Sequence, residues 1–183
     1  MRITLFLGDI AYAPAEALCT STNPRLSLAM GTGASVRERA GYEVLRACEA
    51  LRNGRELAAG TAHTTTAGAL PNKMLIHCVA SDATHRSSEE IVRRCVASAL
   101  RCAEEGNCSS VAMPVFASGH AHVNFKRAVS AIAQALAEAR TAVREVIVVV
   151  NDRDRIDDLR AAFGEKVPLI RSNVPEEETV GWF

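Results

Sequence analysis

Short apolar runs alternate with longer helical patterns along this chain, and that alternation constrains its fold more than any other feature. The clearest run, residues 146–150, contains only valine and isoleucine, which is typical of a strand covered on both faces of a sheet. Strands that alternate with helices of ten or more residues predict an α/β fold, because parallel strands need long crossover connections. Such a sheet also needs helices on both faces. We therefore expect a three-layer α/β/α sandwich with a mixed, largely parallel central sheet.

Turn and capping signals set the boundaries of the expected elements. Ser87 with Glu90 forms a capping-box pattern that predicts a helix start, and Gly106-Asn107 predicts the end of that helix. Gly41 interrupts the helix expected over residues 36–51, and Pro114 demands a bulge or a local break in its strand. The expected strands are residues 3–7, 17–22, 60–66, 74–79, 111–116 and 146–150, and the further helices are residues 125–140 and 156–163.

The length of the chain favours a single domain. A chain of 183 residues lies within the usual size of one domain and can bury enough surface to fold without disulfides. The last residues contain proline and several glutamates. We expect one domain over residues 1–170 and a C-terminal tail over residues 171–183.

Charge and composition exclude several classes of partner. Lys plus Arg and Asp plus Glu number 21 each, so no net field draws the protein to nucleic acid or to an anionic membrane. Aromatic residues are only 4% of the chain, which argues against a stacking platform for single strands. No apolar run approaches about 18 residues, and no signal peptide opens the chain. We expect a cytoplasmic protein with no membrane partner and no specific nucleic-acid partner.

The six cysteines predict buried thiols rather than a metal site. None forms a Cys-x-x-Cys pair, so zinc ribbons and thioredoxin-like redox motifs lack support. Most lie in apolar runs, as Cys78 and Cys95 do, which is typical of core thiols in a reducing compartment. We expect neither a metal nor a cofactor.

The loops after the expected strands are the candidate binding region. Ligands of open α/β sheets bind beyond the carboxyl ends of the strands, which here are the loops after Leu7, Thr22, Val79, Phe116 and Val150. Two of these loops contain Gly with Ser or Thr and lead into helices, so their backbone N–H groups suit a phosphate. Two such loops could grip a diphosphate from opposite sides. The chain contains neither a Gly-x-Gly-x-x-Gly fingerprint nor a Walker loop.

Four motifs, taken in order along the chain, resemble those of the macrodomain family. They are Gly8-Asp9-Ile10, then Thr22-Asn23 before the glycine loop Gly31-Thr32-Gly33, then the Ile76-His77 strand, and then Pro114-Val115-Phe116-Ala117-Ser118-Gly119. Each motif is modest alone, but their order and spacing over about residues 3–163 are similar to the family's. The resemblance implies the family's fold and the binding of ADP-ribose or a derivative, either free or attached to a protein.

The resemblance also implies roles for individual residues. Asp9 would accept a hydrogen bond from the adenine amino group with help from the Ile10 backbone, and Asn151 would lie near the adenine. The segment from residue 30 to 35 would line the phosphates and the distal ribose, and the backbone from residue 118 to 120 would hold the diphosphate. The expected ligand-binding residues are Asp9, Ile10, Asn23, Gly31, Thr32, Gly33, Ala117, Ser118, Gly119, His120, Ala121 and Asn151.

The sequence departs from the family at positions that bear on hydrolysis. Leu28-Ala29-Met30-Gly31 replaces the usual run of glycines. Hydrolytic members of one branch carry an Asp ten residues after the motif Asn, and Gly33 stands there in this chain. The aromatic residue that often packs on the distal ribose is Ala121, and the glycine that follows it is His122. These changes favour binding over the family's usual hydrolysis.

Two histidines keep a different hydrolysis open. His120 and His122 flank a small residue in the loop expected to hold phosphates, and histidine can act as a general acid or base or contact a phosphate. They would cleave an acetyl ester or a 1″-phosphate at the distal ribose, with Asn23 orienting the ribose or a water. The alternative is that both are surface residues, so whether the chain is an enzyme stays open. A third interpretation is a degenerate macrodomain for another nucleotide or a nucleic-acid end.

Purely structural roles are open for several candidates. Asp9 follows a strand and a glycine, so it also fits a turn or helix cap. Asn23 precedes a proline, a pair that commonly starts a turn. His77 lies in an apolar run and is expected to be a hydrogen-bonded core residue. The charges over residues 153–158 indicate a solvated helix face.

Overall fold

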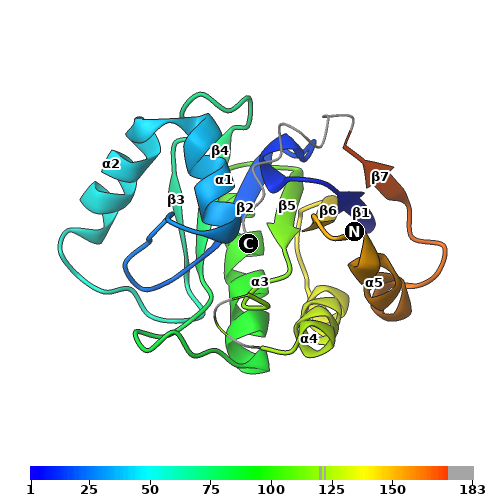
Figure 1. The fold of residues 1–183 in the computed structure, drawn as a ribbon. Coiled ribbons are helices and arrows are strands. Elements are labelled where there is room, and N and C mark those ends of the chain that lie inside the picture. The colour runs from blue at the N-terminus through cyan, green and yellow to red at the C-terminus, as the bar shows by residue number, and fades with distance from the viewer. Residues whose placement is uncertain (120, 122, 173–183) are drawn as a thin grey trace.

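One sheet organises the part of the chain that the computed structural model describes, which comprises residues 1–119, 121 and 123–172. Its strand order is β3-β4-β2-β5-β6-β1-β7 (Figure 1). β3 runs antiparallel to β4 and all other pairings are parallel, so the expected mixed, largely parallel sheet is confirmed. The strands are β1 (Arg2–Leu7), β2 (Ala17–Thr22), β3 (Ala62–Thr65), β4 (Met74–Val79), β5 (Ser110–Pro114), β6 (Glu145–Val150) and β7 (Leu169–Arg171).

Helices cover both faces of this sheet, which confirms the three-layer sandwich (Figure 1). Two helices and a 3-10 turn share one hydrophobic core with the sheet: α1 (Gly31–Ala40), α2 (Tyr42–Arg52) and η1 (Ile10–Tyr12). The other core contains α3 (Glu89–Glu105), α4 (Phe125–Glu138) and α5 (Ile156–Phe163). A second 3-10 turn, η2 (Arg153–Arg155), leads directly into α5.

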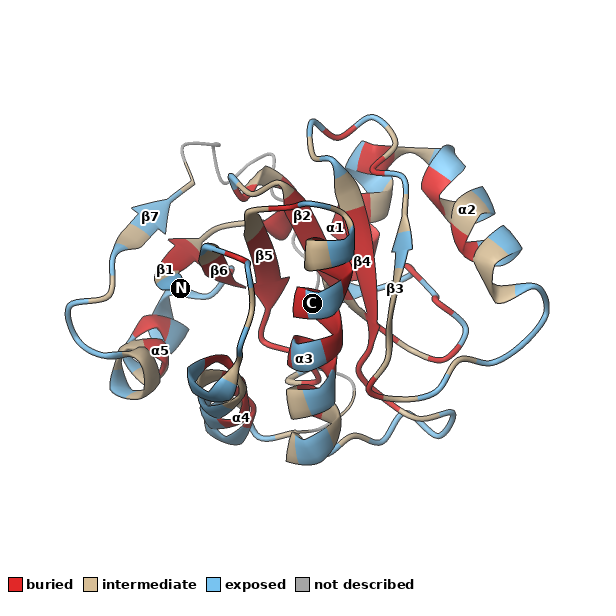
Figure 2. Ribbon diagram, turned by 180° about the vertical axis from the view of Figure 1, so that it is seen from behind, coloured by how far each residue is buried: buried red, intermediate tan, exposed pale blue. Residues whose placement is uncertain are grey.

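Strand β6 shows why a run without polar residues belongs between two layers of helices. Val146, Val148 and Val150 pack in the core of α3, α4 and α5, whereas Ile147 and Val149 pack in the core of α1 and α2. Successive side chains of a strand point to opposite faces, so a strand buried on both faces is apolar at every position. In Figure 2 the central strands are coloured as buried, whereas the edge strands β3 and β7 are intermediate or exposed.

Two boundaries fall at the residues that the sequence singled out. The helix expected from residue 36 begins earlier, at Gly31, and breaks at Gly41. Gly41 has a φ of 86°, a conformation that favours glycine. β5 ends at Pro114 and not at residue 116. Its register with β6 is continuous up to the pair Pro114 and Val149, so of the two alternatives expected at the proline, a bulge or a local break, the structure shows the break.

Two further differences concern the start of α3 and the C-terminal edge of the sheet. The residue that caps α3 is Ser88, whose Oγ accepts the N–H of Ile91 at 3.2 Å, so the expected cap at Ser87 is wrong. Strand β7 was not expected: it is short, mostly exposed and paired in parallel with β1. It carries the sheet past residue 170. The rest of the expected tail, residues 173–183, lies outside the described residues.

The buried histidine of the core has hydrogen-bond partners on both ring nitrogens. His77 is fully buried, with Nδ1 2.9 Å from Thr20 Oγ1 and Nε2 2.8 Å from Thr65 Oγ1. Burial lowers the pKa of His77 to about 4, so its ring is neutral at pH 7. The expected core role of His77 is therefore confirmed. The six cysteines are free and buried, as expected.

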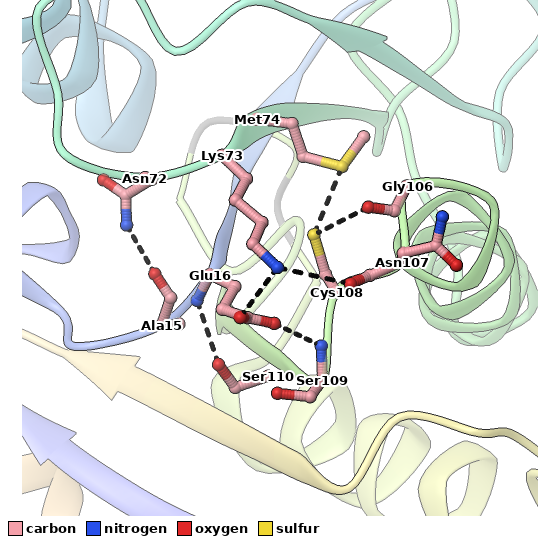
Figure 3. Close-up of polar contacts among 10 residues, drawn as sticks. All are labelled: Ala15, Glu16, Asn72, Lys73, Met74, Gly106, Asn107, Cys108, Ser109 and Ser110. Atoms are coloured by element: carbon pink, nitrogen blue, oxygen red, sulfur yellow. Dashed lines mark hydrogen bonds and ion pairs between the residues drawn. The ribbon is translucent and has the colours of Figure 1, made fainter.

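A polar clamp joins the amino ends of β2, β4 and β5, on the edge of the sheet opposite the carboxyl ends (Figure 3). Glu16 Oε1 lies 2.8 Å from Lys73 Nζ, and Glu16 Oε2 accepts the N–H of Ser109. The backbone N–H of Glu16 donates to Ser110 Oγ at 2.9 Å. The contact with Lys73, followed by that with Ser109, lowers the pKa of Glu16 to about 2. One carboxylate therefore ties three strand starts together.

Candidate functional site

A cavity of about 440 Å³ lies at the carboxyl ends of the strands. It is lined by residues of the loops after β1, β2, β4, β5 and β6, the five loops that the sequence analysis selected. These strands are neighbours in the order β4-β2-β5-β6-β1, so the β4 loop forms one end of the cavity and the β1 loop the other. At about 4.8 Å per strand, the two ends are about 19 Å apart.

Asp9 and Ile10 form the β1 end of the cavity. Asp9 Oδ1 accepts the N–H of Ala11 at 2.9 Å and the hydroxyl of Ser35, so Asp9 is a cap of η1. Both bonds end on Oδ1, and no described residue donates to Oδ2. Ile10 is the first residue of η1, and its N–H has no intrahelical acceptor. Adjacent residues therefore offer one carboxylate oxygen and one N–H to the cavity.

Gly8 allows the chain to pass from β1 to Asp9, because a side chain at position 8 would clash with its neighbours. A Cβ on Gly8 would lie 2.6 Å from Ser172 Cβ and 2.9 Å from the ring of Phe6. Real Cβ atoms essentially never approach so closely, so glycine is required where β1 leaves the sheet. This close approach explains the glycine of the Gly8-Asp9-Ile10 motif.

The N-terminus of α1 opens into the cavity. Met30 occupies the N-cap position without a side-chain cap, and Gly31 and Thr32 line the cavity. The first N–H groups of a helix lack intrahelical partners and carry the positive end of its dipole, which attracts anions. Gly33 is not among the residues that line the cavity. A Cβ at this position would lie 3.0 Å from Leu28 Cα. Gly33 permits close packing inside the fold instead.

Asn23 lines the cavity and also builds the turn after β2. Its Oδ1 accepts the N–H of Arg25 at 3.0 Å and the N–H of Ser27 at 3.3 Å. The turn role that the Asn-Pro pair suggested is therefore confirmed. Among the described residues Nδ2 has no hydrogen-bond partner, so this amide group remains available as a donor.

The loop between β5 and α4 forms the wall opposite α1. Ala117 has a φ of 60°, which is uncommon for a residue with a Cβ. No described residue accepts the N–H of Ser118 or that of Gly119, and a Cβ on Gly119 would meet nothing within 4 Å. The loop therefore contains backbone donors without protein partners, in residues that line the cavity. Four of the expected residues in it line the cavity: Ala117, Ser118, Gly119 and Ala121.

Arg155 is a cavity residue that the sequence analysis assigned to a solvated helix face. Its guanidinium lies 4.7 Å from the centroid of the Phe125 ring and forms ion pairs with Asp152 at 3.4 Å and with Asp158 at 3.9 Å. Phe125, Asp152 and Arg155 line the cavity beside the expected Asn151. Arg155 follows the end of β6 by five residues, so its place in a loop at the carboxyl end of a strand was the signal for it.

His85 and Ser81 line the cavity from the loop after β4. The sequence analysis pointed to this loop but named no residue in it. His85 has a φ of 59° and is exposed, whereas Ser81 is buried. A histidine that follows a buried strand was the available signal, although nothing in the sequence shows that the loop folds back over the cavity.

Three further points concern a metal site, a membrane-spanning helix and the candidate catalytic histidines. No group of three or more His, Cys, Asp or Glu side chains there could hold a metal ion. No helix of that part is long and apolar enough to cross a membrane. His120 and His122, the candidate catalytic histidines, lie outside the described residues.

The sequence of this chain matches that of known proteins over most of its length. Residues 19–132 match the Macro domain model, and the chain belongs to the macro domain family. It is 31% identical over 169 residues to a macro domain-containing protein of Streptomyces nogalater, an alignment that covers 89% of this chain and 92% of that protein. It is 28% identical over 122 residues to the O-acetyl-ADP-ribose deacetylase of Escherichia fergusonii, covering 64% and 68% of the two chains.

Solved structures share the fold at lower sequence identity. A variant of the Oceanobacillus iheyensis macrodomain with ADP-ribose superimposes with a TM-score of 0.81 at 23% identity, covering 88% of this chain and 91% of that one. The Trypanosoma brucei macrodomain in complex with ADP-ribose superimposes with a TM-score of 0.78 at 18% identity, covering 87% and 68%. These likenesses establish the macrodomain fold.

Proposed function

We propose that this chain binds ADP-ribose in the cavity, with the adenine at the β1 end and the diphosphate between α1 and the β5–α4 loop. The observation that carries the proposal is the arrangement of unpartnered donors and one acceptor along a single cavity. Structures of the same fold that contain ADP-ribose support it. The ligand is either free or attached to a protein.

The β1 end suits an adenine ring. The exocyclic amine of adenine is a donor and the neighbouring ring nitrogen is an acceptor. Asp9 Oδ2 and the N–H of Ile10 provide the complementary acceptor and donor. The guanidinium of Arg155 lies over the ring of Phe125, and both residues line the cavity together with Asn151. A base can stack on this planar cationic group.

The middle of the cavity suits a diphosphate. The open N-terminus of α1 presents the backbone of Gly31 and Thr32, and the opposite loop presents the N–H groups of Ser118 and Gly119. Backbone donors from two sides neutralise an anion without lysine or arginine. This agrees with a chain whose acidic and basic residues balance.

Calorimetric titration with ADP-ribose tests the proposal. The wild type should bind one molecule, and Gly119→Glu should abolish binding because it puts a carboxylate where the diphosphate lies. Gly119→Ala, whose Cβ meets no protein atom within 4 Å, should fold normally and lose less affinity than Gly119→Glu. Ala97→Glu on the exposed face of α3 adds the same charge away from the cavity and should also bind normally. Normal binding by Gly119→Glu would remove this loop from the site.

Hydrolysis at the distal ribose is a second candidate function. The match to a relative that is an O-acetyl-ADP-ribose deacetylase favours it. Asn23, which lines the cavity, would orient the ribose or a water, and His120 or His122 would transfer the proton. Release of acetate from O-acetyl-ADP-ribose by the wild type, lost in His120→Ala or His122→Ala with unchanged ADP-ribose affinity, would support this function. Binding without turnover would leave a binding module.

A further inference from the structure

The two ends of the cavity differ in chemistry. Asp9 and Asp152, the acidic side chains among the described lining residues, belong to the β1 and β6 loops, where Asp152 is paired with Arg155 at 3.4 Å. The opposite end presents donors: the imidazole of His85, the hydroxyl of Ser81 and the amide of Asn23. No described carboxylate lines the cavity at that end. Such an end suits a group that is rich in acceptors and negatively charged.

His85 is positioned by its loop and not by contacts of its own side chain. Asp82 Oδ1 accepts the N–H of Thr84 at 2.8 Å and the N–H of Arg86 at 2.9 Å, while the N–H of His85 donates to the carbonyl of Asp82 at 3.1 Å. These bonds hold His85 at its φ of 59° and occupy an oxygen of Asp82, which does not line the cavity. The His85 imidazole has no hydrogen-bond partner in the described part of the chain.

We propose that His85 is a specificity-determining residue, which contacts the ligand at the end remote from the adenine and favours ADP-ribose derivatives that carry a phosphate on the distal ribose. The inference rests on the proposed function, because the distal ribose reaches the β4 end only if the adenine lies at the β1 end. A phosphate offers three strong acceptor oxygens. His85, Ser81 and the free Nδ2 of Asn23 supply matching donors.

Ser81 supports this assignment independently of His85. Its side chain is almost fully buried, at 5% exposure, and among the described residues its hydroxyl has no hydrogen-bond partner. The oxygen itself is not enclosed by protein, because Ser81 lines the cavity. The hydroxyl is therefore free to donate to a ligand at the same end as His85.

The test compares the affinities of ADP-ribose and ADP-ribose 1″-phosphate for three proteins by calorimetry. The wild type should bind the phosphorylated ligand about tenfold or more tightly than ADP-ribose, the effect of a charge-assisted hydrogen bond. His85→Gly removes the imidazole but tolerates the positive φ, and should reduce this ratio to about threefold or less. Arg86→Ala, on the same loop but outside the cavity lining, should keep the ratio and so exclude a general attraction of anions.

The outcomes separate this inference from the proposed function. His85→Gly should still bind ADP-ribose, because the adenine and diphosphate contacts remain, and the measured quantity is the ratio of its affinities for the two ligands. An unchanged ratio in His85→Gly, or a wild type that binds the two ligands equally, would overturn the role of His85 while ADP-ribose binding stands. A wild type that binds neither ligand would overturn both proposals.

Discussion

The carboxylate of Asp9 shows how one residue can serve both the fold and the site. Oδ1 is fully engaged, by the N–H of Ala11 and the hydroxyl of Ser35. Oδ2 has no donor among the described residues, so a ligand amine can use it without loss of the cap. The two interpretations that the sequence left open, cap and ligand contact, are therefore compatible.

Replacement of Asp9 by Asn separates these two duties. The Asn side chain keeps an oxygen for the cap but turns an NH₂ toward the adenine amine, which sets two donors against each other. Loss of this bond should cost about 1.5–3 kcal/mol, or about tenfold or more in ADP-ribose affinity. The melting temperature should change little. The control is Ser35→Ala, which removes only the other bond to Oδ1. Unchanged affinity in a folded Asp9→Asn would exclude Asp9 as an adenine contact.

The sequence predicted which single residues line the cavity where a short motif fixes the backbone. It did not do so where packing between distant elements fixes the position of a residue. Asp9, Ile10, Ser118 and Gly119 lie in loops at strand ends and line the cavity as expected. Gly8 also lines it, although it was not among the expected ligand-binding residues. Gly33 was expected there as well, but it does not line the cavity, and a Cβ at this position would lie 3.0 Å from Leu28 Cα. This close approach depends on how α1 packs against the preceding loop. No local pattern reports it.

At the scale of elements, the clamp around Glu16 holds the strand starts that face away from the cavity (Figure 3). It joins β2, β4 and β5, and the opposite ends of the same strands carry the β2, β4 and β5 loops of the site. Polar contacts therefore fix the mutual register of these strands at the end remote from the cavity. The clamp stabilises the framework without contacting the cavity.

We predict that Glu16→Gln lowers stability in a pH-dependent manner. The pKa of Glu16 falls from its ordinary value of 4.5 to about 2 in the folded state, chiefly through Lys73. The carboxylate therefore stabilises the fold fully above about pH 4.5, and this contribution disappears as the pH falls toward 2. Urea midpoints of the wild type and the variant should differ at pH 7 and converge near pH 2.

Glu49→Gln, on the exposed face of α2, is the matched control and should follow the wild type at every pH. A difference between the wild type and Glu16→Gln that is constant from pH 7 to pH 2 would contradict an ionic origin of the stabilisation.

Elements were predictable where their pattern is strong. The run at residues 146–150 and the helical spacing of α3 gave both elements, since each is buried along a whole face. β7 was missed because it is three residues long and exposed at the edge of the sheet. Pro114 marks the end of β5 and not a bulge, because the chain leaves the sheet there.

At the scale of the whole molecule, the cavity exists because the loops at the carboxyl ends of five parallel strands lie together. The sequence predicted that edge from the alternation of strands and helices, and the resemblance to macrodomains suggested the proposed ligand. The order of the strands was not predictable from the pattern alone. That order places the β4 loop and the β1 loop at opposite ends, and so decides that His85 lies far from Asp9.

The measurement that tests the account most directly is a crystal structure of the chain grown with ADP-ribose. The account predicts the adenine amine within hydrogen-bond distance of Asp9 Oδ2, the diphosphate between the N-terminus of α1 and Gly119, and the distal ribose toward the β4 loop. A ligand bound in the reverse direction, or outside the cavity, would contradict it.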